Sequence, residues 1–100
     1  MSNKVKQIID ELVKNYQQEK VILFGSQRTG KTHEWSDVDL VVIKKTTKKF
    51  RDRIREASSS FKHVLPVDLI VYTPEEFAKM SKENWFVKDE VLEKGQVMYG

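Results

Sequence analysis

The sequence predicts an α/β domain in which a small mixed β-sheet is flanked by helices. Helical and extended periodicities alternate along the chain, without internal repeats or a linker-like stretch rich in proline and glycine. The chain has 100 residues, which is enough for one hydrophobic core but not for two. We therefore expect a single domain that spans residues 1–100.

The first part of the chain predicts a helix followed by two strands. In residues 5–16 the apolar side chains recur at every third or fourth position, which places them on one face of an amphipathic helix. Residues 21–24 and 38–43 are short apolar runs rich in β-branched side chains, as central strands are.

A helix and a third strand follow. Residues 50–61 keep helical apolar spacing, and residues 67–72 form another β-branched run. A helix that joins two strands is typical of a crossover between parallel neighbours. We therefore expect strand 67–72 to lie beside strand 38–43, parallel to it.

The last third of the chain predicts two more helices. Residues 73–76 provide a threonine N-cap, a proline in the first turn and a glutamate three residues after the cap, which together make a capping box. A final helix near residues 84–94 should end at Gly95. We expect Trp85 and Phe86 to anchor this helix in the core.

Three aspartates form the candidate metal site. Asp37 and Asp39 lie two residues apart at the start of a predicted strand, so they project to the same face with Cα atoms about 6.5 Å apart and can share divalent cations. Asp68 is the second residue of strand 67–72 and would join them if the two strands are neighbours. Each aspartate alone is typical of a turn or an exposed edge. Three carboxylates together repel one another unless a cation compensates, so the group favours a metal enzyme over a structural protein.

A glycine and a serine provide the complementary half of the site. Gly25 ends the first strand and lets a phosphate approach the backbone, while the N–H groups of a helical turn and the Ser26 hydroxyl can hold triphosphate oxygens. Residues 25–32 also match the P-loop pattern G-x-x-x-x-G-K-[ST]. Only four residues separate Thr32 from Asp37, which is too few for the helix that a P-loop requires. We therefore reject the P-loop and favour nucleotidyl transfer.

These residues resemble a known family, the minimal nucleotidyltransferases (MNT) of the DNA polymerase beta superfamily, many of which act as antitoxins in MNT/HEPN pairs. The family signature is Gly-Ser, ten residues and then Asp-x-Asp, and it corresponds here to Gly25 and Ser26 followed by Asp37 and Asp39. Residues 66–77 resemble the third-carboxylate strand of the family and the helix that follows it. The resemblance covers nearly the whole chain and implies a polymerase-beta-like nucleotidyltransferase fold.

The resemblance also implies an activity, in which AMP is transferred from ATP to a hydroxyl group and pyrophosphate is released. The implied acceptor is a tyrosine on a partner HEPN-domain toxin, which the transfer neutralises. The catalytic residues, which would also bind Mg²⁺, are Asp37, Asp39 and Asp68; the nucleotide-binding residues are Gly25, Ser26, Arg28 and Lys31. Thr29 stands where many members carry arginine, so Arg28 or Lys31 would contact the phosphates instead.

Two alternative functions remain open. The chain could be a non-catalytic antitoxin or interaction subunit that blocks its partner by contact alone. It could also transfer a nucleotide to a small molecule or to RNA, although a domain of this size has no second unit to form an acceptor pocket unless a homodimer or a partner provides one.

Composition adds weaker constraints. The formal net charge of +3 slightly favours phosphate-bearing or acidic partners. A basic segment could contact RNA or an acidic partner, but a solvated helix face is favoured; it comprises Lys44, Lys45, Lys48, Lys49, Arg51, Arg53 and Arg55. The absence of cysteine excludes disulfides, and no stretch approaches the roughly 20 apolar residues of a membrane span. We therefore expect a soluble, cytoplasmic protein.

Overall fold

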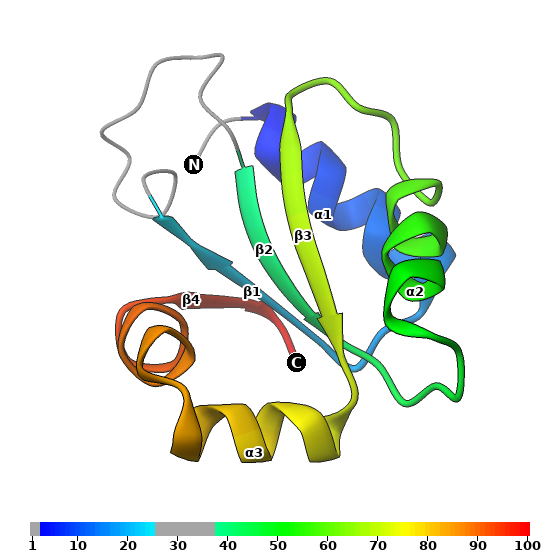
Figure 1. The fold of residues 1–100 in the computed structure, drawn as a ribbon. Coiled ribbons are helices and arrows are strands. Elements are labelled where there is room, and N and C mark those ends of the chain that lie inside the picture. Colours follow the sequence, from blue (N-terminus) through cyan, green and yellow to red (C-terminus); the bar gives the residue numbers. More distant parts are fainter. Residues whose placement is uncertain (1–2, 26–37) are drawn as a thin grey trace.

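A computed structural model describes residues 3–25 and 38–100, which form a four-stranded sheet with helices on both faces (Figure 1). The elements in chain order are α1 (Asn3–Tyr16), β1 (Lys20–Phe24), β2 (Val38–Ile43), α2 (Phe50–Ser58), β3 (Val67–Tyr72), α3 (Pro74–Glu83), the π-helix η2 (Val87–Glu93) and β4 (Gln96–Tyr99). Within these ranges, no helix has both the length and the apolar character that crossing a membrane requires.

The sheet is mixed, as the sequence predicts. Its strand order is β3-β2-β1-β4, with β2 and β3 parallel and β1 antiparallel to both β2 and β4. The helix α2 makes the crossover between the parallel pair (Figure 1). Because both neighbours of β1 run antiparallel to it, the strand before Gly25 is not part of the parallel arrangement that a P-loop needs.

Alternate side chains of the strands build a core on each face of the sheet. On one face, α1 and α2 cover the larger core, to which the two central strands contribute Val21, Leu23, Val38, Leu40 and Val42. On the other face, α3 and η2 cover a smaller core of Ile22, Val41, Ile43 and Val91, with Phe24, Tyr72 and Phe77 packed at its margin. The two pairs of helices lie on opposite sides of the sheet in Figure 1.

The last helix is anchored differently from our expectation. Val87 and Val91 are the buried residues of η2, whereas Trp85 is 71% exposed and Phe86 is 42% exposed. The side-chain oxygen of Asn84 accepts a hydrogen bond from the Val87 N–H at 3.2 Å, which fixes the start of this helix. The prediction that Trp85 and Phe86 anchor it in the core was therefore wrong, because the two valines occupy the inward positions.

The capping box at the start of α3 is confirmed, and it has an additional partner. The Thr73 hydroxyl accepts from the Glu76 N–H, and the Glu76 carboxylate accepts from the Thr73 N–H. The same carboxylate oxygen also accepts from Arg53 Nη1 at 2.6 Å. Arg53 thereby connects α2 to the start of α3.

Arg53 does not belong to a solvated face. The residue is 8% exposed, and its Nε donates to the Lys48 carbonyl at 2.7 Å. Its Nη1 also lies 3.4 Å from the Val71 carbonyl near the end of β3. The prediction of a solvated basic face is therefore wrong for Arg53, because its side chain turns inward and connects three elements. Arg51 and Arg55 in the same helix are exposed.

We expect Arg53→Met to lower the free energy of unfolding by about 2 kcal/mol, because the variant leaves several acceptors without their buried donor. Arg55→Met is the matched control, and a change within about 0.5 kcal/mol is expected there since its side chain is exposed. Urea unfolding of both variants measures the difference. Equal losses in the two variants would contradict the role of Arg53.

The Arg53–Glu76 pair should also make stability depend on pH. The hydrogen bond from Arg53, followed by that from the Thr73 N–H, lowers the pKa of Glu76 from its usual 4.5. A lowered folded-state pKa adds stability above the unfolded-state value, and this contribution disappears as the pH falls through the folded-state value. Glu76→Gln should therefore cost about 1 kcal/mol at pH 7, and the gap to the wild type should close towards pH 3. A gap that widens on acidification would contradict this.

Gln18 is a buried polar residue at the turn between α1 and β1. It is 4% exposed, and neither Oε1 nor Nε2 has a hydrogen-bond partner in the part of the chain that the structure describes. We expect Gln18→Met, which keeps an unbranched side chain, to raise the free energy of unfolding by about 1 kcal/mol. Gln96→Met at an exposed position is the control. A Gln18→Met variant that unfolds at lower urea concentration than the wild type would show that the side-chain amide of Gln18 does make stabilising hydrogen bonds.

Candidate functional site

Two of the three predicted aspartates lie side by side at one end of the sheet. Asp39 on β2 and Asp68 on β3 are directly opposite each other in the parallel register. Each is the second residue of its strand, and parallel strands place their N-terminal ends at the same edge of the sheet. Strand alternation puts both side chains on the face covered by α3 and η2. The predicted adjacency of strand 67–72 and strand 38–43 therefore brings these two carboxylates together.

Gly25 lies directly against one of these carboxylates. Phe24, the last residue of β1, is the register partner of Asp39 on the antiparallel side of β2. Gly25 follows with φ of +75°, a conformation that residues with a Cβ rarely adopt. A Cβ atom at this glycine would lie 2.4 Å from Oδ2 of Asp39. The position is therefore restricted to glycine both by its backbone and by the carboxylate beside it.

Among the described elements, α3 does not start at the end of the sheet that carries the carboxylates. Asp39 is half-buried, and Asp68 is exposed. The helix α3 starts immediately after the C-terminal end of β3, so it covers the end of the sheet that is opposite to the two aspartates (Figure 1). An exposed carboxylate beside a half-buried one leaves room for a ligand that approaches from solvent.

An aromatic pair borders the carboxylates on the side of β1. The rings of Phe24 and Phe86 are 5.6 Å apart between centroids with an interplanar angle of 82°, an edge-to-face contact. Phe24 is opposite Asp39, so this pair is next to the carboxylates along the same row of the sheet. The pair was not predicted from the sequence, since only the fold brings a residue after α3 to the end of β1.

The other predicted site residues lie in the segment 26–37, outside the described residues. They are Ser26, Arg28, Lys31 and the third aspartate, Asp37. Among the residues that the structure describes, no group of three or more histidine, cysteine, aspartate or glutamate side chains could hold a metal ion. The described residues thus include two of the three predicted metal-binding aspartates, Asp39 and Asp68.

The two described carboxylates suit a hard cation. Mg²⁺ prefers oxygen ligands and is usually bound through one or two carboxylates together with phosphate oxygens. Asp39 and Asp68 offer such oxygens from one register position, and the absence of a side chain at Gly25 keeps the space beside Asp39 Oδ2 open. These residues fit the group that the family resemblance implies.

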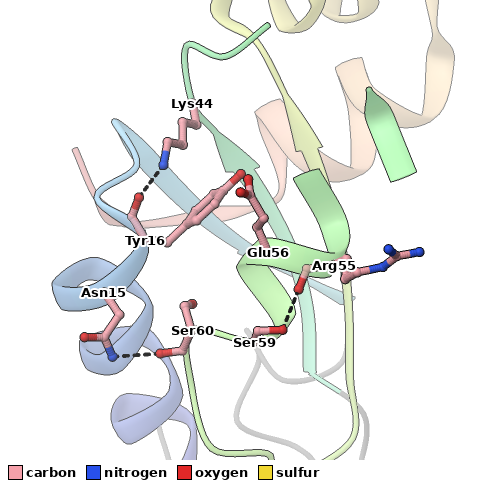
Figure 2. A pocket seen from close by; sticks show the side chains of 7 residues that line it. All are labelled: Asn15, Tyr16, Lys44, Arg55, Glu56, Ser59 and Ser60. Carbon is pink, nitrogen blue, oxygen red and sulfur yellow. Dashed lines mark hydrogen bonds between the residues drawn. The ribbon is translucent and has the colours of Figure 1, made fainter. Parts of the chain in front are cut away.

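A hollow of about 570 Å³ lies elsewhere, between α1 and the end of α2 (Figure 2). Its polar contacts connect neighbouring elements: Lys44 Nζ donates to the Tyr16 carbonyl at 2.6 Å, and Asn15 Nδ2 donates to the Ser60 carbonyl at 2.8 Å. Arg55 lines the hollow but extends its guanidinium away from the other labelled side chains (Figure 2). Because α1 and α2 cover the face opposite to Asp39, this hollow is separate from the candidate site.

Comparisons with known proteins agree with this geometry. Residues 4–98 match the family model described as a nucleotidyltransferase domain. The chain is also 35% identical, over 97 residues, to a protein of Haemophilus influenzae named probable protein adenylyltransferase MntA; the match covers 90% of this chain and 82% of that protein. No solved structure matches the chain at a significant level. The strand order, the paired aspartates and the extent of these matches lead to one conclusion: the chain belongs to the nucleotidyltransferase domain family and is a minimal nucleotidyltransferase enzyme with a polymerase-beta-like fold.

Proposed function

We propose that this nucleotidyltransferase moves AMP from ATP to a hydroxyl group of another protein in an Mg²⁺-dependent reaction. The observation that carries the proposal is the position of Asp39, which lies opposite Asp68 and beside Gly25, where a Cβ atom would be 2.4 Å from its Oδ2. The name of the relative, a probable protein adenylyltransferase, supports AMP as the transferred group and a protein as the acceptor. We further propose that the acceptor is a tyrosine of a partner HEPN-domain toxin, so that the enzyme acts as an antitoxin in the cytoplasm.

In this proposal the aspartates bind the metal ion, and the residues around Gly25 bind the triphosphate. Asp37, Asp39 and Asp68 would hold Mg²⁺, which when bound neutralises charge that develops on the phosphates. Gly25 and Ser26 would hold the triphosphate through backbone N–H groups and the serine hydroxyl, with Arg28 or Lys31 as its cationic contact.

The chemical step is an in-line displacement. The acceptor oxygen forms a bond to the α-phosphorus, the bond from that phosphorus to the bridging oxygen breaks, and pyrophosphate leaves with the electron pair. Asp68 would accept the hydroxyl proton on a carboxylate oxygen as the new bond forms. Its exposure supports this role, because an acceptor on another protein has to reach the base from solvent.

The position of the carboxylates also favours an acceptor from a second molecule. Asp68 is exposed beside Asp39 at one end of the sheet, and the hollow that the described residues form between α1 and α2 is on the opposite face. A macromolecular acceptor can approach such an exposed carboxylate without a dedicated pocket, whereas a small molecule usually needs a concave site.

The test uses ATP labelled at the α-phosphate, Mg²⁺ and the product of the neighbouring gene as candidate acceptor. We expect label on the acceptor and AMP-sized mass increments, both lost when EDTA replaces Mg²⁺ and when the modified tyrosine is changed to phenylalanine. A stable complex without label would instead support the non-catalytic antitoxin. Label on RNA or on a small molecule, with none on protein, would show that the acceptor is RNA or a small molecule instead.

A further inference from the structure

Phe86 is an aromatic side chain that lies beside the candidate site without being part of the core. It is 42% exposed, although η2 is anchored by the buried Val87 and Val91. Its helix begins at the Asn84 cap, which holds the Val87 N–H. The buried valines anchor the helix, and the Phe86 ring keeps a large exposed fraction.

The ring of Phe86 has a defined orientation. It makes an edge-to-face contact with Phe24, 5.6 Å between centroids and 82° between planes. Phe24 itself packs at the margin of the smaller core, next to Ile22, Val41, Ile43 and Val91. A partly exposed ring that packs in this way offers an apolar surface to a ligand.

The distance between this ring and the carboxylates is short. Phe24 is opposite Asp39 in the antiparallel pair, where facing side chains have Cβ atoms about 5 Å apart. The ring of Phe86 contacts that of Phe24, so it lies on the order of 10 Å from Asp39. A nucleotide with its phosphates at Gly25, Asp39 and Asp68 would be able to place its base against this ring.

We propose that Phe86 forms the nucleobase subsite, where its ring packs against the base of the bound nucleotide. This inference rests on the proposed nucleotidyl transfer and names a binding residue that lies outside the glycine-serine and aspartate motifs. A planar base stacks favourably on an aromatic side chain without any hydrogen bond to the edge of the base. The subsite therefore selects by ring area and binds purine nucleotides more tightly than pyrimidine nucleotides.

The test separates the base from the phosphates. The dissociation constants of ATP, CTP and inorganic triphosphate are measured with Mg²⁺ by titration calorimetry for the wild type and Phe86→Ala. We expect ATP to bind about tenfold more weakly to the variant, CTP to lose less affinity, and triphosphate to bind equally well to both proteins. Phe86→Trp should keep the affinity for ATP. Leu92→Ala, which removes another exposed apolar side chain near the same helix, should change none of the three constants.

Each contrary outcome has a distinct meaning. A wild-type protein that binds neither ATP nor triphosphate would overturn the proposed function itself. If Phe86→Ala binds ATP as tightly as the wild type does, the nucleobase subsite is overturned, but the proposed function is not. Equal losses for ATP and triphosphate would also overturn the subsite, because the variant would then have damaged the fold or the phosphate site. An unchanged affinity for ATP with reduced labelling of the acceptor would assign the ring to the acceptor instead.

Discussion

Replacing Asp39 with asparagine is expected to lower the rate of nucleotidyl transfer by about a thousandfold or more while leaving the fold intact. The two side chains have nearly the same shape, so the contact with Gly25 and the pairing of β2 with both neighbours are preserved. What is lost is one negative charge opposite Asp68, and with it a proposed ligand for Mg²⁺. Single-turnover labelling with saturating ATP measures the rate, and Mn²⁺ binding followed by electron paramagnetic resonance measures the cation site.

The control for this experiment is Asp10→Asn. Asp10 is an exposed carboxylate of α1, the helix on the opposite face of the sheet, so its loss should leave the rate within twofold of the wild type. If Asp39→Asn transfers AMP at a rate similar to that of Asp10→Asn, Asp39 takes no part in the reaction, and the candidate site is assigned to the wrong residues.

Gly25→Ala is expected to lower the transfer rate by about a hundredfold and the free energy of unfolding by about 1–2 kcal/mol. The positive φ of this residue opposes any side chain, and the added methyl group would overlap Oδ2 of Asp39, 2.4 Å away. The carboxylate has to move, and displacement of the proposed metal ligand by about 1 Å is enough for a loss of that size. Urea unfolding and single-turnover labelling report the two effects separately.

The comparison variant is Gly95→Ala. A Cβ atom there would meet the Val91 carbonyl at 2.2 Å and a methyl carbon of Ile22 at 2.8 Å, so the variant should also lose stability. It should keep the transfer rate of the folded protein, since the overlap involves η2 and the core rather than an aspartate. A Gly25→Ala variant that is destabilised but fully active would show that the position of Asp39 Oδ2 does not matter for transfer.

Local patterns in the sequence were enough to predict most of the fold. The amphipathic stripe of α1, the β-branched runs of β1 to β3 and the capping box at Thr73 each depend on residues close in sequence, and each is confirmed. The parallel pairing of β2 with β3 followed from the intervening helix α2, because a crossover of that length permits little else. This pairing also places Asp39 and Asp68 opposite each other.

The features that were missed depend on partners distant in sequence. Arg53 occupies an inward position of α2, but its acceptor Glu76 is 23 residues away and could not be identified from a local pattern. The strand β4 has only four residues, most of them exposed, which is too short for a periodicity to predict it. Among the consecutive apolar residues 85–87, the sequence does not indicate which one faces the sheet.

The candidate site was predictable in its residue types more than in its contacts. The spacing between Gly25 and Asp39 suggested a shared site, but the overlap of the glycine with a carboxylate oxygen requires the antiparallel register of β1 and β2. The aromatic pair was not predictable, since Phe24 and Phe86 are brought together only when the last helix folds back over β1. Ion pairs and ring contacts of this kind join residues that are distant in sequence, so they depend on how the strands and helices are connected.

The edge strand β3 is restrained unequally along its length. Near its C-terminal end, Arg53 connects the Val71 carbonyl to α2 and to the first turn of α3, whereas Asp68 near the N-terminal end is exposed. Amide protons in the first half of β3 should therefore exchange with solvent by local opening, and those in the second half only by global unfolding. On gradual warming, the enzyme would lose the alignment of its carboxylates before it melts, so inactivation would precede cooperative unfolding.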